Sequence, residues 1–118
     1  MAGKLVHVEI VASDEDRAVG FWSGVFGWKI GDSVMEGMDY RMFQTADDQG
    51  GAIYPGDKPG NLIVYFDTDD IDASVAKVRE LGGSADDKQP VPSQGWFASC
   101  KDTEGNSFSL WQADPNAA

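Results

Sequence analysis

Hydrophobic and polar positions alternate with a period of two near the start of the chain. Residues 5–11 (LVHVEIV) place Val or Ile at every second position and put His7 and Glu9 on the opposite side, as in a strand with one buried face. Apolar residues then recur at three- and four-residue spacing. This predicts an amphipathic helix with Ser13 as its N-cap and Gly27 as its end. The apolar positions of this helix are Ala18, Phe21, Trp22, Val25 and Phe26.

Two of those aromatic residues, Phe21 and Trp22, are expected in the core, because they fall on the apolar stripe of the predicted helix. Three short apolar runs follow the helix and are separated by glycines and polar turns, which is typical of strands. The predicted strands lie at 28–30, 40–45 and 51–54.

The second half of the chain repeats this order after a segment rich in glycine and proline. Residues 55–60 (PGDKPG) have the composition of a linker. The elements predicted after the linker are a strand at 62–66, a helix from Asp69 or Asp70 to Leu81, and strands near 84–86, 95–101 and 107–112. The order of elements therefore starts again after residue 60.

Two glycines mark the period of this repeat. Gly27 and Gly82 each end a predicted helix and lie 55 positions apart (82 − 27). We interpret the chain as two βαβββ modules, at about 4–55 and about 61–113. A half of this size has too little core to fold alone. We therefore expect the modules to pair their sheets into a single α+β domain that spans residues 1–118.

Charge and composition exclude several classes of partner. The chain has 9 basic and 20 acidic residues and a formal net charge of −11, which repels phosphate backbones and anionic lipids. We therefore expect neither nucleic acid nor a membrane surface as a partner. A membrane span is not expected either, because no apolar run approaches the roughly 18 residues that it needs. The N-terminus shows no signal segment, and a single cysteine excludes an internal disulfide and a CxxC metal site. The composition predicts a cytoplasmic protein.

Two sets of motifs carry a family resemblance. The opening set is 7–10 (HVEI), 14–22 (DEDRAVGFW) and 25–28 (VFGW), and the closing set is 69–72 (DDID), 81–83 (LGG) and 102–106 (DTEGN). Together they resemble the vicinal oxygen chelate (VOC) superfamily, which includes glyoxalase I, extradiol dioxygenases and bleomycin-resistance proteins. The resemblance implies a glyoxalase/bleomycin-resistance fold, in which two tandem modules form a cupped mixed sheet around a cavity. It also implies a homodimer.

The resemblance further implies where a divalent metal would bind, because metal-dependent members place one ligand on each of four strands. Carried onto this sequence, the four positions fall on His7, near 51–53, on Leu62 or Ile63, and on Ser109. Only His7 is a usual metal ligand, and a catalytic divalent cation needs about three protein ligands. Glu9 as a second ligand would still leave the site incomplete. We therefore expect no metal cofactor, with three of the four family positions lost.

Alternation along the strands predicts which side chains line the cavity. The expected ligand-binding residues are Tyr40, Met42, Ile63, Tyr65, Trp96, Ser109 and Trp111, with Arg41 and Phe43, or Phe97, as the alternative faces of their strands. His7 and Glu9 are the candidate catalytic residues, because a carboxylate that orients an imidazole raises its basicity. His7 can equally be a structural histidine, and Glu9 can equally pair with Arg41 or another cation.

Three functions stay open at this point. The favoured one is a metal-free protein that binds or sequesters a small molecule in an aromatic-lined cavity, with cationic ligands preferred because of the net charge. The alternative is a lyase or isomerase of the VOC type, similar to lactoylglutathione lyase. It would use His7 and Glu9 as an acid–base pair or a degenerate metal site. The third is an interaction protein without a small ligand.

Overall fold

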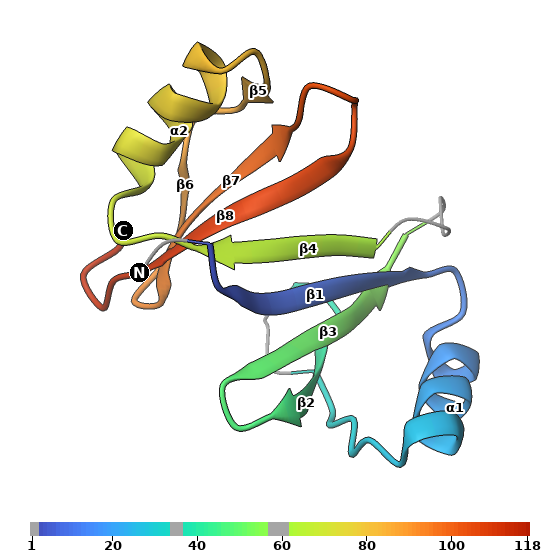
Figure 1. The fold of residues 1–118 in the computed structure, drawn as a ribbon. Helices are drawn as coiled ribbons and strands as arrows, with labels where there is room; N and C mark the ends of the chain where they lie inside the picture. The colour runs from blue at the N-terminus through green and yellow to red at the C-terminus, as the bar shows by residue number, and fades with distance from the viewer. Residues whose placement is uncertain (1–2, 34–36, 57–61) are drawn as a thin grey trace. The chain divides into compact units, whose positions relative to one another are not determined.

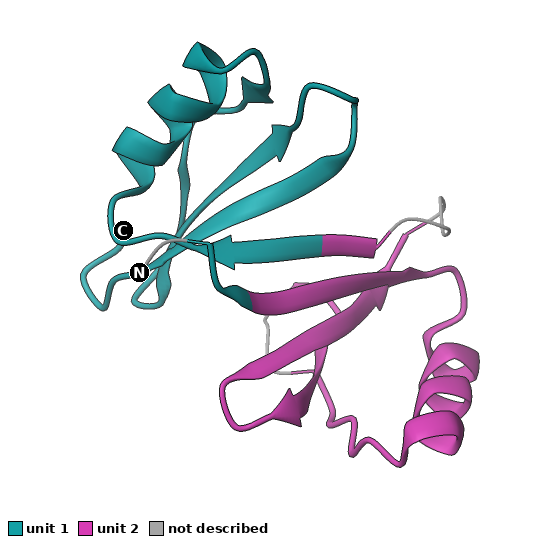
Figure 2. Cartoon of the chain, viewed as in Figure 1, with its two compact units in different colours: residues 1–5, 64–118 teal, residues 6–63 magenta. Residues whose placement is uncertain are grey.

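The computed structural model of the chain describes residues 3–33, 37–56 and 62–118. Contacts divide the chain into two compact units, which are unit 2 (residues 6–63) and unit 1 (residues 1–5 and 64–118) (Figure 2). Each unit has one helix and strands of its own (Figure 1). Most of the predicted linker 55–60 lies outside the described residues.

Unit 2 contains one helix and a small mixed sheet. Its elements are β1 (Leu5–Ala12), α1 (Glu15–Phe26), β2 (Arg41–Ala46) and β3 (Gln49–Pro55). β3 pairs with β1 in parallel and with β2 antiparallel. The strand predicted at 28–30 does not form. Instead Trp28 stacks on Phe43, with 4.4 Å between the ring centroids. Residues 28–30 therefore add side chains to the core but do not pair with a neighbouring strand.

The ends of α1 follow the sequence pattern with one correction. Asp14, and not Ser13, is the N-cap, and its carboxylate accepts a hydrogen bond of 3.0 Å from the backbone N–H of Arg17. The helix ends at Gly27, as predicted. Its φ of 72° is a left-handed conformation, which costs glycine little.

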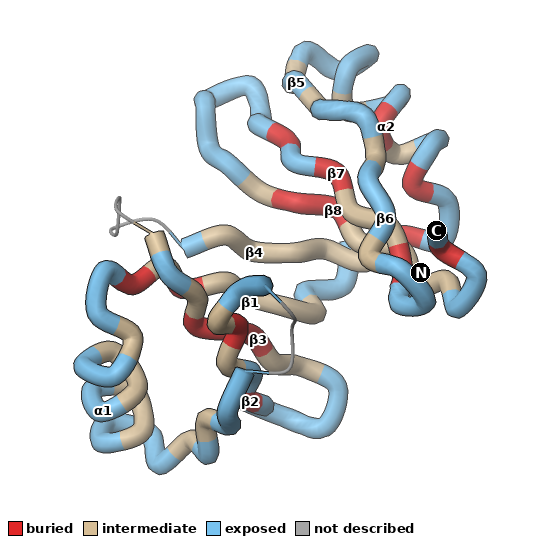
Figure 3. Tube along the Cα trace, turned by 180° about the vertical axis from the view of Figure 1, so that it is seen from behind, coloured by how far each residue is buried: buried red, intermediate tan, exposed pale blue. Residues whose placement is uncertain are grey.

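The core of unit 2 lies between the sheet and α1. Its buried members are Ile10, Ala12, Phe43 and Ile53, and Trp22 packs against them as predicted. No residue of α1 is itself buried (Figure 3). The expectation that Phe21 is a core residue is wrong, because the residue is 62% exposed and its ring meets that of Trp22 edge-on.

Unit 1 has one helix and a set of parallel and antiparallel strands of its own. Its elements are β4 (Leu62–Asp67), α2 (Ile71–Glu80), β5 (Ser84–Ala85), β6 (Gln89–Val91), β7 (Gly95–Lys101) and β8 (Ser107–Ala113). β8 pairs with β4 in parallel and with β7 antiparallel, while β5 and β6 both pair with β7. The sequence pattern did not predict β6, which is only three residues long and contains a proline. Proline lacks the N–H of a strand ladder.

The core of unit 1 lies between α2 and one face of its sheet. Asp70 caps α2, and its carboxylate accepts from the backbone N–H of Ala73 at 3.1 Å. The buried cluster consists of Ile71, Val75, Ala98, Cys100 and Leu110. The predicted α+β class is therefore confirmed, with one helix against one face of a mixed sheet in each unit. Neither helix of the described residues is long and apolar enough to span a membrane.

Candidate functional site

Two ionisable side chains share one face of β1. In the parallel ladder with β3, His7 lies opposite Gly50 and Glu9 lies opposite Ala52. The alternate positions of β1, among them Ile10, pack into the core beneath α1. Because successive side chains of a strand point to opposite faces, His7 and Glu9 lie on the face of the unit 2 sheet away from α1.

The hydroxyl of Tyr40 joins His7 to Glu9. It donates a hydrogen bond of 2.6 Å to Glu9 Oε2, and His7 Nε2 lies 2.7 Å from the same oxygen. Since the hydroxyl proton points to Glu9, the Nε2–H tautomer of His7 completes the chain by donating to Tyr40 Oη. Tyr40 is only 8% exposed. We call this hydrogen-bonded chain, His7–Tyr40–Glu9, the relay.

Burial sets the ionisation of the relay and its surroundings. Burial lowers the pKa of His7 below its ordinary value of 6.5, and the charge of Glu9 opposes that change only in part. Burial, helped by the charge of Glu9, raises the pKa of Tyr54, whose ring lies 6.2 Å from that of Tyr40. At neutral pH the site therefore holds a neutral imidazole beside the protonated phenol of Tyr54, and the uncharged imidazole can act as a base.

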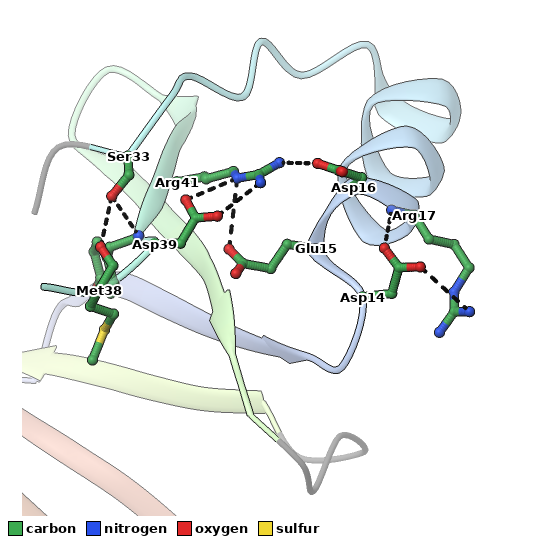
Figure 4. Close-up of polar contacts among 9 residues, drawn as sticks. Asp14, Glu15, Asp16, Arg17, Ser33, Met38, Asp39 and Arg41 are labelled. Carbon is green, nitrogen blue, oxygen red and sulfur yellow. Dashed lines mark hydrogen bonds and ion pairs between the residues drawn. The ribbon is translucent and has the colours of Figure 1, made fainter.

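The strand that follows Tyr40 shows which of its two faces lies beside the relay, the face of Tyr40 and Met42 or that of Arg41 and Phe43. Phe43 is buried in the core beneath α1, whereas Met42 is exposed. Tyr40 and Met42 thus belong to the face of the relay. Arg41 pairs with Asp39 and Asp16 (Figure 4), so the cation suggested as a partner of Glu9 is held elsewhere.

Other predicted ligand-binding residues lie in unit 1, on the face of its sheet away from α2. Tyr65 lies opposite Ser109 in the β4–β8 ladder, and Trp111 lies opposite Phe97 in the β7–β8 ladder. Ser109 is buried. Paired residues of neighbouring strands share a face, so the register places Phe97, one of the two alternatives, beside Trp111. Ile63, in β4, belongs to unit 2 and is half-buried.

Trp96 has a structural position. It packs against the cluster beneath α2, and its Nε1–H donates to Asp114 Oδ2 at 2.9 Å. The ammonium of Lys88 lies 4.6 Å from the centre of its ring, a cation–π contact. Both the ring face and the indole N–H are thus engaged by neighbours within unit 1.

The residues at the family's metal positions do not fit a divalent cation. Gly51, Ala52 and Ile53 are buried and have no donor side chain, and Ser109 is a weak ligand. Across the described residues, no three His, Cys, Asp or Glu side chains are grouped so that they could hold a metal ion. His7 Nε2 already contacts a hydroxyl. The side chains at these positions therefore do not make a divalent-cation site.

The sequence pattern did not predict that Tyr40 bridges His7 and Glu9. The pattern named Tyr40 only as a lining residue, and it lies 33 and 31 positions from the two side chains that it joins. No periodicity relates positions so far apart. An aromatic residue with a hydroxyl at the start of a strand was the only signal.

Comparisons with known proteins agree with the fold and with the motifs. The family described as glyoxalase-like domain matches residues 7–111. "Putative glyoxylase CFP32" of Mycobacterium bovis and of Mycobacterium tuberculosis is 32% identical over 120 residues, which cover 96% of this chain. The same match covers 45% of those proteins, so the chain spans less than half the length of these curated relatives.

Solved structures share the fold at low sequence identity. Methylmalonyl-CoA epimerase from Mycobacterium tuberculosis superimposes with a TM-score of 0.74 at 14% identity, over 95% of this chain and 89% of that protein. Homoprotocatechuate 2,3-dioxygenase from Brevibacterium fuscum gives a TM-score of 0.71 at 18% identity, over 99% of this chain and 38% of that one. Identities this low show the fold alone. The family match over residues 7–111 shows that the chain belongs to the glyoxalase-like domain family of the VOC superfamily.

Proposed function

We propose that this chain is a metal-free small-molecule-binding protein whose ligand contacts the relay. The observation that supports the proposal is the hydrogen-bonded chain itself, which places a carboxylate, a phenol and an imidazole side by side. Small-molecule sites typically combine aromatic surface with a few polar groups that orient the ligand. Tyr54 adds a second aromatic ring beside Tyr40.

The charge of the protein defines the preferred ligand class. Glu9 contributes a carboxylate to the relay, and the whole chain has a net charge of −11. Planar cations gain both from this field and from contact with aromatic faces. The ligand we propose is therefore a planar aromatic cation, whose positive charge lies near Glu9.

A binding experiment with proflavine, a planar aromatic cation, tests this proposal. We expect its fluorescence to report saturable binding that Glu9→Gln weakens about tenfold, the effect of losing one close opposite charge. Glu104→Gln is the matched control, since it removes the same charge from an exposed turn of unit 1. Equal affinities of the two variants, or no saturable binding by the wild type, would contradict the proposal.

The relay also favours a second candidate function, an isomerase or lyase that moves protons. With Nε2–H donated to Tyr40, the basic lone pair of His7 is on Nδ1. As Nδ1 takes a proton from a carbon acid, the Nε2 proton passes to Tyr40 Oη and the hydroxyl proton passes to Glu9 Oε2. The reverse transfer returns one proton to the neighbouring carbon while a hydroxyl proton of the substrate moves to the former carbonyl oxygen. The relay therefore ends as it began and the substrate is isomerised.

The name of the curated relatives suggests a probe for this second function. The hemithioacetal of methylglyoxal and glutathione is a carbon acid that the alternative activity would isomerise. We expect turnover to require His7 and to fall about a hundredfold in Tyr40→Phe, a typical contribution of acid–base catalysis. Turnover that survives His7→Ala, or wild-type protein without turnover, would remove this candidate.

Two further sequence predictions, a homodimer and a cytoplasmic location, stay predictions. Analytical ultracentrifugation of the purified chain tests the first one directly. A sedimentation coefficient of the 12.7 kDa monomer at micromolar concentration would contradict the dimer. Localisation of the tagged protein by cell fractionation tests the second one.

A further inference from the structure

The hydroxyl of Tyr40 depends for its place on a segment that precedes the sheet. Tyr40 is the last residue before β2 begins at Arg41. Its backbone N–H donates to Ser33 Oγ at 2.9 Å and to the carbonyl of Met38 at 3.0 Å. Ser33 Oγ in turn donates to the same carbonyl at 2.8 Å. Tyr40 thus lies outside the β2–β3 ladder, and its backbone N–H is bound by residues of the segment that precedes β2.

The two residues that flank Tyr40, Asp39 and Arg41, form an ion pair with each other. The Nε of Arg41 donates to Asp39 Oδ1 at 3.1 Å and its Nη2 donates to Asp39 Oδ2 at 2.8 Å. This is the two-pronged geometry that a guanidinium forms with a carboxylate. Asp39 and Arg41 directly precede and follow Tyr40. Their ion pair therefore restrains the backbone of that one residue.

The same guanidinium also connects residues 39–41 to α1. Nη1 of Arg41 donates to Asp16 Oδ1 at 2.8 Å, and Nε lies 3.7 Å from Glu15 Oε2. Both acids belong to the first turn of α1, and Figure 4 shows the Arg41 side chain extended toward them. The Arg41 side chain is 22% exposed, so these contacts are partly shielded from water.

From these contacts we infer that Arg41 is a positioning residue of the relay, which holds the Tyr40 hydroxyl between His7 and Glu9 by fixing the flanking residues to α1. The inference rests on the proposed function, because it gives the relay its supporting structure. The side-chain hydrogen bonds of Arg41 go to Asp39 and Asp16. Arg41 acts through the backbone of Tyr40.

The carboxylates around the Arg41 guanidinium explain why position 41 needs an arginine. One guanidinium uses different N–H groups to donate to two carboxylates, those of Asp39 and Asp16, while its Nε lies 3.7 Å from a third, that of Glu15. Glu15 Oε2 is buried and makes no hydrogen bond within the described residues. A lysine ammonium is a single point charge and cannot span both Asp39 oxygens and Asp16. Arg41→Lys should therefore retain the charge but lose the positioning.

The experiment reads the relay directly in the ligand-free protein. His7 is the only histidine of the chain, so the exchange rate of its Nε2 proton is measured without overlap by ¹H–¹⁵N NMR. We expect Arg41→Lys to raise that rate at least about fivefold and Arg41→Gln about tenfold or more, because local opening frees the proton. Arg17→Gln is the matched control. Arg17 lies in α1 directly after Asp16, its side chain is 75% exposed, and its Nη1 lies 3.9 Å from Asp14 Oδ2.

Each outcome separates the inference from the proposed function. An unchanged exchange rate in both Arg41 variants would overturn the positioning role and leave the relay intact. Fast exchange in the wild type would contradict the relay itself, and both proposals would fall with it. If the Arg41 variants do not fold, Asp16→Ala, at a side chain that is 89% exposed, should raise the rate about threefold. No rise in that folded variant would equally overturn the inference.

Discussion

Removal of a single oxygen atom tests the central contact of the site. Tyr40→Phe keeps the aromatic ring and deletes the hydroxyl that bridges His7 and Glu9. The bond to Glu9 is short, at 2.6 Å, and has a carboxylate acceptor. Hydrogen bonds to charged groups contribute about 1.5–3 kcal/mol, and a bond between neutral groups, such as that to His7, contributes about 1 kcal/mol.

The expected loss in the free energy of unfolding is therefore about 3 kcal/mol at pH 7, from the sum of these two bonds. For a chain of this size such a loss lowers the melting temperature by roughly 10 °C. Chemical denaturation with urea measures the free energy, and calorimetry measures the melting temperature. An m-value equal to that of the wild type shows that the folded and unfolded states remain comparable.

Tyr54→Phe supplies the matched control. It deletes the same atom from a ring only 6.2 Å from that of Tyr40, but the Tyr54 hydroxyl makes no hydrogen bond within the described residues. We expect its effect to stay within about 0.5 kcal/mol. A double-mutant cycle of Tyr40→Phe with Glu9→Gln should give a coupling energy of about 1 kcal/mol or more. Equal stabilities of the two Phe variants, or a coupling near zero, would refute the relay.

Three further predictions concern ionisation and packing. By NMR titration the pKa of His7 should lie below 6.5. The unfolded chain then takes up the proton first, so stability should fall as the pH drops below about 6.5, and His7→Gln should remove that slope; a His7 pKa above 6.5 would contradict the argument. Burial raises the pKa of Glu15, whose carboxylate therefore favours folding when protonated and opposes it as the pH rises. Glu15→Gln should raise the melting temperature at pH 7 but not near pH 4, and an equal effect at both would exclude this cause. A Cβ at Gly51 would collide with the Val8 carbonyl, so Gly51→Ala should cost about 2 kcal/mol or more in denaturation experiments, whereas Gly20→Ala, in open space on α1, should be neutral or stabilising.

Local patterns in the sequence predicted those parts of the fold that short-range rules control. The period-two alternation of residues 5–11 predicted β1 and the shared face of His7 and Glu9, which the ladder with β3 confirms. Apolar spacing and the glycine at position 27 predicted α1 and its end. These features depend on neighbours within a few positions, and backbone geometry makes them repeat with a fixed period.

Short-range rules failed where competing local signals were nearly equal. Ser13 and Asp14 are both good N-caps, and only the position of the first helical hydrogen bonds selected Asp14. Residues 28–30 had a strand-like composition, but Trp28 stacks on Phe43 and its segment pairs with no strand. Phe21 fitted the apolar stripe, yet α1 rests on the sheet along the Ala18 and Trp22 side and leaves Phe21 exposed.

The sequence by itself determined the family, the α+β class and the presence of an imidazole and a carboxylate on one strand face. Only the tertiary structure decided that Tyr40 lies between them and that Arg41 pairs with Asp39 and Asp16 and not with Glu9. The physical reason is the range of the interactions. Periodicity records which face of an element is buried, whereas a hydrogen bond between residues 31 or 33 positions apart depends on how a turn places its side chain against another strand.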